Sequence, residues 1–213
     1  MKLYGPAQSP FVARVRIACR AKGLTVEEAS IPATGLKSLE FLALNPIGKV
    51  PVLIGANMPI IESETILDYI EDCFPDPPLR PVSPLDRARM RTIIRITDNY
   101  VLVPVSRLFT QFDPRTRDQQ LVDRELGYWR AGLGWLAAFV ADAPHALGAS
   151  LTLADCVLAP SLLLSDLISG MVNAGDMVGE HLTLAGYRDK VLANDAVRIE
   201  LDRTKAALEA LRN

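Results

Sequence analysis

Asn45-Pro46-Ile47-Gly48-Lys49-Val50-Pro51-Val52-Leu53 is the stretch of sequence on which the fold prediction depends. Its first proline and its glycine predict a turn, and the apolar residues that follow predict a strand over residues 52–54. Because proline has no amide hydrogen to donate, Pro51 fits the first position of a strand or an edge strand. The turn residues Gly55-Ala56-Asn57 then predict a hairpin with a second strand over residues 59–61.

The chain around this hairpin alternates between strand and helix patterns. Strands are predicted over residues 2–4 and 25–31, and an amphipathic helix over residues 10–22 lies between them, which makes a βαβ unit. A short helix over residues 36–42 precedes the hairpin, and a longer one over residues 63–73 follows it. The first third of the chain is therefore predicted to be a mixed α/β domain.

A proline-rich segment separates this part from the rest. Residues 74–84 hold five prolines, which can neither continue a helix nor donate to a sheet. We predict a first domain over residues 1–76, a linker over 77–84 and an all-helical second domain over 85–213. Apolar residues recur at steps of three and four from Met90 to Leu108, and Pro104 is expected to kink that helix. Further helices are predicted over residues 116–141, 153–169, 181–193 and 195–211.

Composition argues against several classes of function. The net charge of -2 provides no basic field for a nucleic acid or an anionic membrane. No apolar run approaches the roughly 20 residues that span a bilayer, and the first residues do not resemble a signal peptide, so we expect a cytoplasmic protein with neither membrane nor nucleic acid as partner.

Histidines and cysteines provide no metal site in the sequence. His145 and His181 lie far apart, so no metal is expected. Cys19, Cys73 and Cys156 are odd in number, and each lies in an apolar helical pattern, so we expect three buried structural thiols.

Three motifs, in this order, resemble the glutathione transferase family over essentially the whole chain. They are Ser9 to Arg16 at the start of the first helix, Asn45 to Leu53, and Glu62 to Ile70 at the start of the third helix. The pattern is similar to bacterial-type members with a serine in the active site. The resemblance implies an α/β plus all-α architecture, in which a thioredoxin-like domain binds glutathione and an all-helical domain follows it. It also implies a homodimer.

The resemblance implies glutathione contacts at five residues. The family's proline at Pro51 is in the cis form, which exposes the backbone of Val50 so that the tripeptide can pair with it as an added strand. Ser63 is expected to cap the third helix and to bind the γ-glutamyl carboxylate there, while Glu62 meets the amino group. Lys37 could reach the glycyl carboxylate, although a solvated surface lysine is the alternative.

Ser9 is the candidate catalytic residue. A thiol has a pKa near 8.5, so an enzyme that uses glutathione as a nucleophile must favour its thiolate. A hydroxyl at the positive end of a helix does so by donating a hydrogen bond and by its position, and Ser9 precedes Pro10 at such a helix start. Tyr4 is expected in the core instead, and no cysteine replaces Ser9, which disfavours thiol reductase chemistry.

The second substrate is expected in a mostly apolar pocket, which suits a hydrophobic ligand. Its candidate residues are Ala7, Gln8 and Phe11 on one side and Tyr100, Val103 and Arg107 of the long helix on the other. Arg107 has a surface arginine as its alternative interpretation. Thr152 to Asp155 matches a capping box, which concerns folding rather than chemistry.

The leading hypothesis is that the glutathione thiolate is conjugated to a hydrophobic electrophile, with a role in detoxification. The alternatives are a glutathione-dependent cis-trans isomerase of the maleylacetoacetate or maleylpyruvate type and a glutathione-binding module without turnover. Gln8-Ser9-Pro10 departs from the Ser-Ser-Cys triplet of the isomerase branch. The sequence does not name the electrophile.

Overall fold

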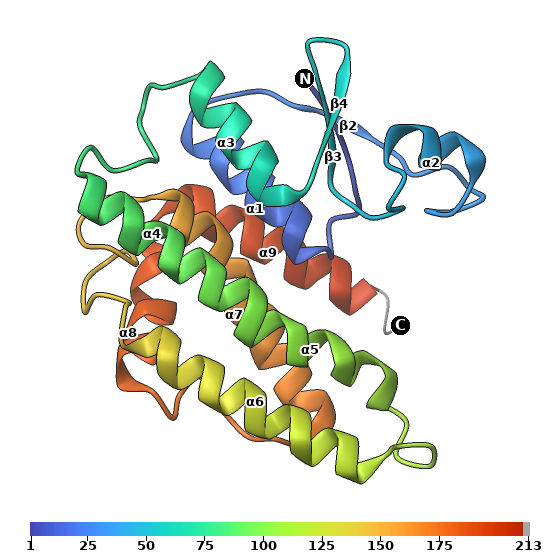
Figure 1. Ribbon diagram of the computed structural model, residues 1–213, viewed down its shortest axis with the longest axis vertical. Coiled ribbons are helices and arrows are strands. Elements are labelled where there is room, and N and C mark those ends of the chain that lie inside the picture. Colours follow the sequence, from blue (N-terminus) through green and yellow to red (C-terminus); the bar gives the residue numbers. More distant parts are fainter. Residues whose placement is uncertain (211–213) are drawn as a thin grey trace. The chain divides into compact units, whose positions relative to one another are not determined.

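The computed structural model describes residues 1–210, and the chain forms two compact units (Figure 1). The first unit joins Met1–Leu79 to the C-terminal segment that begins at Asp195. The second unit is Arg80–Asn194. The predicted end of the last helix at Leu211 lies outside the described residues.

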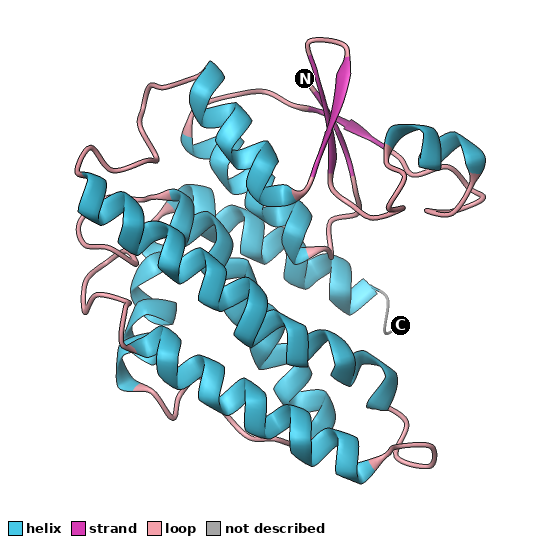
Figure 2. Cartoon of the chain, in the orientation of Figure 1, coloured by secondary structure: helices cyan, strands magenta, loops and turns pink. Residues whose placement is uncertain are grey.

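The first unit contains a mixed sheet, drawn as magenta arrows in Figure 2, and four helices. The strands are β1 (Lys2–Tyr4), β2 (Glu27–Ala29), β3 (Val52–Gly55) and β4 (Met58–Ile61), in the order β2-β1-β3-β4. The helices are α1 (Pro10–Ala21), α2 (Leu39–Leu44), α3 (Ser63–Cys73) and α9 (Asp195–Ala210). This is the predicted α/β arrangement of the first domain.

Because of the strand directions and register, the connections after β1, β2 and β4 and the connection before β3 lie at one edge of the sheet. Strand β1 runs parallel to β2, with Tyr4 opposite Ala29, and antiparallel to β3, with Tyr4 opposite Val52. Strand β4 is antiparallel to β3 and pairs Ile61 with Val52. The ends of β1, β2 and β4 and the start of β3 therefore lie side by side.

The core of the first unit lies between the sheet and helices α1 and α3. Its buried members come from alternate positions of strands and from one face of each helix: Leu3, Val12, Val15, Cys19, Leu53, Ile66 and Ile70. Tyr4 is half-buried and meets Phe41 of α2 edge-on, with ring centroids 6.4 Å apart. The expectation that Tyr4 lies in the core is therefore wrong, because Leu3 is the core residue of β1 and Tyr4 points to the opposite face of the sheet.

The second unit, Arg80–Asn194, has other boundaries than the predicted second domain, which is expected over residues 85–213 after a linker over 77–84. Segment 74–79 is held to the first unit because the buried ammonium of Lys22 donates to the carbonyls of Phe74 and Pro77, at 2.7 and 2.8 Å. Glu71 pairs with Lys22 and accepts from the Leu79 amide at 3.1 Å. Helix α9 packs on α1 and so belongs to the first unit, although its sequence pattern continues the helical series before it.

The second unit is helical, as the sequence predicts. Its elements are α4 (Pro84–Ile96), a π-helical turn η1 (Thr97–Leu102), α5 (Val103–Leu108), the short 3-10 turn η2 (Phe109–Gln111), α6 (Gln119–Ala137), α7 (Leu153–Val172), α8 (Leu182–Lys190) and the 3-10 turn η3 (Val191–Ala193). Helix α7 starts at the predicted capping box of Thr152 and Asp155. By length and composition α7 could cross a membrane, but 72% of its most apolar window is buried, as in the core helix of a helical unit.

The long helix contains a π-helical turn just before Pro104. Proline cannot donate to the carbonyl four residues earlier, which here is that of Tyr100. The preceding residues form the π-helical turn η1, and α6 crosses it at Gly132. A Cβ atom added at Gly132 would lie 2.2 Å from the Tyr100 carbonyl oxygen, so the two backbones meet where only glycine fits.

Replacing this glycine tests the crossing. We expect Gly132→Ala to lower the free energy of unfolding by about 1–3 kcal/mol, because the new methyl group overpacks the contact with the Tyr100 carbonyl. Gly127→Ala is the matched control in the same helix, since nothing lies within 4 Å of its added Cβ. That control should gain about 0.5–1 kcal/mol from helix propensity. Denaturant unfolding measures both, and equal effects of the two substitutions would contradict the crossing.

Candidate functional site

Three segments with predicted site residues leave the sheet at the same edge. The loop from Gly5 to Ser9 follows β1, Val50–Pro51 precedes β3, and Glu62–Ser63 follows β4. Gly5 has φ +149°, and a Cβ atom there would lie 2.3 Å from a Val12 methyl carbon and 3.3 Å from Val50 Cβ. Glycine at position 5 therefore lets the first loop pass close to the second segment.

Ser9 is the N-cap residue of α1. Its side-chain oxygen accepts a hydrogen bond from the Val12 amide at 3.4 Å, and Pro10 follows at the first helical position. A hydroxyl that accepts this bond still has its own proton to donate. Ser9 can therefore cap the helix and hydrogen-bond an anion beside the positive end of α1 at the same time.

Val50 and Pro51 lie at the start of β3. The peptide bond between them is cis. Val50 lies just beyond the β1–β3 ladder, whose last pair on this side is Tyr4 with Val52. Its backbone groups are thus placed past the end of the paired strands, where an extended peptide could add to them.

The predicted capping role of Ser63 is wrong. Glu62, not Ser63, is the N-cap residue of α3, and no side chain caps this end of the helix within the described residues. Glu62 is exposed and has φ 65°, an uncommon backbone conformation that is found at ligand sites more often than elsewhere. The first amides of α3 are consequently available to an anion.

Arg14 of α1 is a site residue that the sequence reasoning missed. Its side chain is fully buried, and Nη1 donates to Ser63 Oγ at 3.3 Å. The guanidinium also lies over the Phe11 ring, 4.6 Å from its centroid. Because Ser63 Oγ accepts from Arg14, its hydroxyl proton can be donated outward, beside the amides of α3. The signal in the sequence was a charged residue within a helix whose neighbouring residues are apolar.

Lys37 does not point freely into solvent. Its ammonium donates to the Ile47 carbonyl at 2.8 Å and so joins the segment before α2 to the turn after it. An ammonium has three donors, so this bond leaves room for a carboxylate partner. The contact with glutathione that the sequence suggests stays a prediction.

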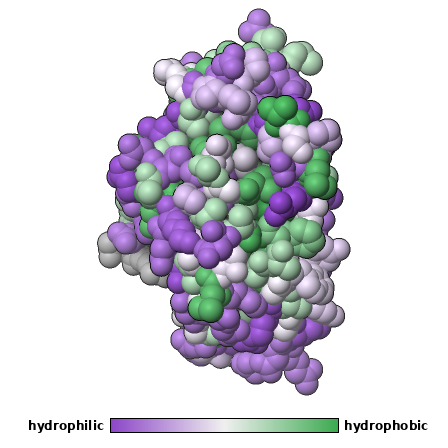
Figure 3. All heavy atoms as spheres, turned by 90° about the vertical axis from the view of Figure 1, so that its left-hand side faces the viewer, coloured by the Kyte–Doolittle hydropathy of each residue, from purple (hydrophilic) through white to green (hydrophobic). Residues whose placement is uncertain are grey.

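The predicted residues of the second-substrate pocket belong to both units. Ala7 and Gln8 are half-buried and Phe11 is 38% exposed in the first unit. In the second unit Tyr100 and Val103 are 49% and 38% exposed, and the Tyr100 ring meets Trp135 edge-on at 5.2 Å. On one face of the molecule, Figure 3 shows green, hydrophobic residues among purple, hydrophilic ones.

Arg107 is tied to its own unit. Its Nη1 lies 3.1 Å from the buried carboxylate of Glu125, which also pairs with Arg124 at 3.2 Å. More than half of the Arg107 side chain is nevertheless exposed. The Arg107 guanidinium thus balances the charge of the buried Glu125 carboxylate. This agrees with the alternative interpretation of Arg107 as a surface arginine, here with a structural role.

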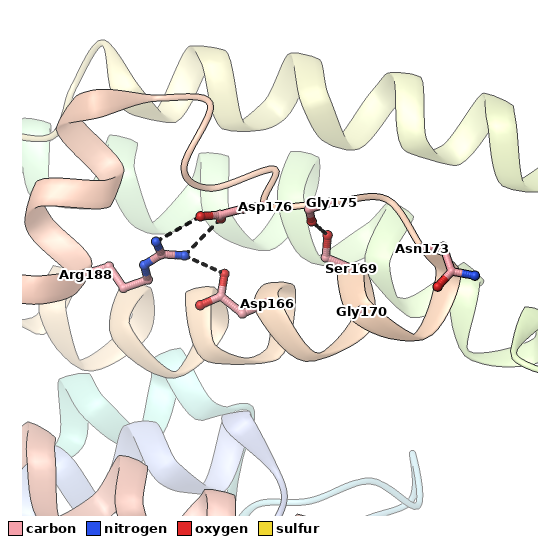
Figure 4. A pocket seen from close by; sticks show the side chains of 7 residues that line it. All are labelled: Asp166, Ser169, Gly170, Asn173, Gly175, Asp176 and Arg188. Atoms are coloured by element: carbon pink, nitrogen blue, oxygen red, sulfur yellow. Dashed lines mark hydrogen bonds and ion pairs between the residues drawn. The ribbon is translucent and has the colours of Figure 1, made fainter.

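A separate pocket of about 450 Å³ lies within the second unit. Figure 4 shows it lined by Asp166, Ser169, Gly170, Asn173, Gly175, Asp176 and Arg188. Its charges pair with each other, because Arg188 Nη1 lies 3.0 Å from both Asp166 and Asp176. None of the predicted site residues lines this pocket, and no other feature singles it out for a ligand.

The expectation of three buried thiols is wrong for Cys73, which is exposed, while Cys19 and Cys156 are buried. Cys73 is the last residue of α3, so it lies where the helix ends. Burial raises the pKa of the Cys19 thiol to about 12. Within residues 1–210, no group of three His, Cys, Asp or Glu side chains could hold a metal ion.

Comparison with known proteins gives a matching family model and several similar proteins. The family model of the glutathione S-transferase N-terminal domain matches residues 3–78. The chain is 30% identical to a stringent starvation protein A homolog of Coxiella burnetii, over 76% of this chain and 74% of that one. It is 28% identical to a glutathione S-transferase of Pseudomonas putida, over 84% and 81%. It is 33% identical to the maleylacetoacetate isomerase of Pseudomonas aeruginosa, over 76% and 80%.

A solved structure shares the fold over nearly the full length. Maleyl pyruvate isomerase, described as a bacterial glutathione S-transferase of the Zeta class, superposes with a TM-score of 0.79 at 24% identity. The match covers 94% of this chain and 96% of that one. Its fold is the thioredoxin-like domain followed by helices that the sequence predicts.

Thiol labelling tests the environments of the cysteines. At pH 8 we expect iodoacetamide to label Cys73 quickly and Cys19 hardly at all, because a thiol whose pKa is about 12 is thiolate in only about one molecule in 10⁴. Cys156 should be protected by burial. Mass spectrometry of native and guanidinium-unfolded protein resolves the three sites. Labelling of Cys19 as fast as Cys73 in the native protein would contradict the assignment.

Proposed function

The chain belongs to the glutathione S-transferase family, and from that premise we propose that it conjugates the glutathione thiolate to a hydrophobic electrophile. The observation that carries the proposal is the common edge of the sheet. Three segments that are far apart in the sequence adjoin this edge of the sheet, and they contain Ser9, Val50 and Ser63. Each has the chemistry that one part of glutathione requires.

We assign the binding of glutathione to the last two of these segments. The cysteinyl unit pairs with the backbone of Val50 as an added strand. The γ-glutamyl carboxylate binds at the uncapped start of α3, where it accepts from helix amides and from Ser63, while buried Arg14 supplies positive charge behind that hydroxyl. Glu62 is exposed beside this point and meets the γ-glutamyl amino group.

We assign the activation of the thiol to Ser9. A hydrogen bond from its hydroxyl to the sulfur, with the positive end of α1 behind it, favours the thiolate over the thiol. A hydrogen bond to a charged group contributes about 1.5–3 kcal/mol, which corresponds to about a 10- to 100-fold increase in the thiolate-to-thiol ratio. Starting from a pKa near 8.5, only the upper part of this range makes the thiolate the main species at pH 7, while the lower part makes it about a quarter of the bound glutathione.

The electrophile is proposed to be hydrophobic because the candidate residues of its pocket are mainly apolar. Among them, Phe11, Tyr100 and Val103 expose apolar surface. Homodimer formation, a cytoplasmic location and a role in detoxification are proposed on the resemblance to the family. Sedimentation equilibrium tests the first of these directly.

Glutathione-dependent cis-trans isomerisation is the second candidate function. The 33% identity to a maleylacetoacetate isomerase favours it. In that reaction the thiolate adds to a conjugated cis double bond, the resulting single bond rotates, and expulsion of the thiolate restores the double bond in the trans form. The same edge and the same Ser9 would serve both reactions. Product analysis separates them, because conjugation consumes glutathione and isomerisation returns it.

Binding of glutathione without turnover is the third candidate. The stringent starvation protein A homolog carries no enzyme name and is 30% identical. If this chain only binds glutathione, it would do so at the common edge of the sheet and would catalyse neither conjugation nor isomerisation. Saturation binding together with absent product would favour it over both enzymes.

Ser9→Ala tests the proposed activation, and Ser83→Ala is its matched control. Ser83 also caps a helix just before a proline, and its Oγ accepts from the Asp86 amide at the same 3.4 Å. Both substitutions should cost about 1 kcal/mol of stability through the lost cap. Only Ser9→Ala should return the pKa of bound glutathione toward 8.5 and lower kcat/KM about 10- to 100-fold.

The measurements are an ultraviolet titration of the bound thiolate, calorimetry of glutathione binding and the rate with a model electrophile. Glutathione affinity should change less than threefold in Ser9→Ala if the hydroxyl acts mainly on the sulfur. A bound thiolate with the same pKa in wild type and Ser9→Ala contradicts the role of Ser9. Absence of glutathione binding at millimolar concentration removes all three candidate functions.

A further inference from the structure

Helix α9 presents polar side chains to the loop before α1, to α1 itself and to strand β2. The two helices pack against each other, and Figure 1 shows α9 in red beside α1 in blue. Three residues of α9, Glu200, Arg203 and Thr204, make contacts with residues from the first 30 positions of the chain. These contacts join parts of the sequence that lie more than 170 residues apart.

Thr204 contacts the loop of the proposed catalytic serine directly. Its side-chain hydroxyl donates to the carbonyl of Ala7 at 3.1 Å. Thr204 is only 3% exposed, so water does not compete strongly for this carbonyl. Ala7 lies two residues before Ser9, inside the turn that leads into α1.

A second contact holds the start of the same loop. Arg16 of α1 donates from Nη2 to the Gly5 carbonyl at 3.2 Å. The guanidinium is itself oriented by two carboxylates, because it forms a bidentate pair with Glu28, at 3.0 and 2.7 Å, and lies 3.4 Å from buried Glu200. Burial raises the pKa of Glu200, while Arg16 acts against that shift. Arg203 also binds Glu28, at 2.6 Å for each nitrogen.

The loop from Gly5 to Ser9 also has a hydrogen bond within its own backbone. The Ser9 amide donates to the Pro6 carbonyl at 3.3 Å. Gly5, Pro6 and Ala7 therefore each have their carbonyl held, the first by Arg16, the second by Ser9 and the third by Thr204. Only the last of these donors comes from α9.

We infer that α9 is part of the catalytic unit and that Thr204 is a positioning residue, which places the Ser9 hydroxyl by holding the Ala7 carbonyl. This inference rests on the proposed function, because it concerns the serine that activates glutathione. Thr204 touches neither substrate nor sulfur and acts through the loop. Among residues 1–210, the Ser9 oxygen has one hydrogen bond, a long one of 3.4 Å from the Val12 amide, so its position depends on the backbone that carries it.

The size of the effect follows from the geometry of hydrogen bonding. A thiolate hydrogen bond weakens steeply when its donor moves or rotates, and a displacement of about 1 Å in a catalytic group can cost about 100-fold in rate. Loss of one anchor out of three should displace the loop less than that. We expect about a three- to tenfold loss of kcat in Thr204→Val, with KM for glutathione changed less than twofold.

The experiment compares five proteins, namely wild type, Ser9→Ala and three threonine variants. Thr204→Val removes the hydroxyl at nearly constant volume, and Thr204→Ser restores it. Thr97→Val is the matched control, because Thr97 is fully buried and its hydroxyl donates to the Ile93 carbonyl at 2.8 Å within the second unit. Amide hydrogen exchange of a peptide spanning residues 5–12 reports on the loop without glutathione, and the ultraviolet titration reports the pKa of the bound thiol.

We expect faster exchange of the loop in Thr204→Val, together with a bound-thiol pKa between that of wild type and that of Ser9→Ala. Thr204→Ser should restore both readouts, and Thr97→Val should lower the melting temperature without changing either. Unchanged loop exchange in Thr204→Val overturns the inference. Faster exchange with an unchanged thiol pKa also overturns it, because Thr204 would then hold the loop without positioning Ser9. Failure of the wild type to bind glutathione overturns the proposed function and, with it, the positioning of Ser9 for the thiol, whereas loop exchange still reports separately whether Thr204 holds the Ala7 carbonyl.

Discussion

The register that sets Tyr4 opposite Val52 and Val52 opposite Ile61 is the constraint on which the candidate site depends. Because β1 and β4 are both antiparallel to β3, the connection before β3 and those after β1 and β4 meet at one edge. A shift by one residue would turn Leu3 and Leu53 out of the core, so burial fixes the register firmly. The same packing that stabilises the first unit thus brings a helix-capping serine, an unpaired strand end and an uncapped helix together.

Two buried arginines of α1 bind segments at this edge of the sheet. Arg14 and Arg16 lie on a helix whose neighbouring side chains are apolar, and each is committed to a functional segment: the former to Ser63, the latter to the Gly5 carbonyl. Burying a guanidinium is costly unless it is paired and hydrogen-bonded. Glu28 and Glu200 supply those partners for Arg16, which explains why α9 belongs to the first unit although it ends the chain.

Local patterns predicted much of the fold but little of how distant segments meet. The hairpin, the helix starts at Ser9 and Thr152, and the change from a mixed sheet to helices follow from turn residues, caps and periodicity, which act over a few residues. Ser63 was misjudged because one residue decides between N-cap and first turn, and positive φ at Glu62 is set by its surroundings. Arg14, Lys37 and α9 depend on partners that local spacing cannot identify, and exposed Cys73 shows that an apolar pattern does not bury every position at a helix end.

The central claim is that the common edge of the sheet binds glutathione, and amide chemical shifts test it most directly. Titration of the isotope-labelled protein with S-methylglutathione, which binds without reacting, is predicted to shift the amides of Ser9, Val50 and Ser63 together, with a single dissociation constant. The amide signals of Gly175 and Asp176, which line the pocket in the second unit, should not shift. Shifts confined to that pocket, or none at millimolar ligand, would contradict the claim.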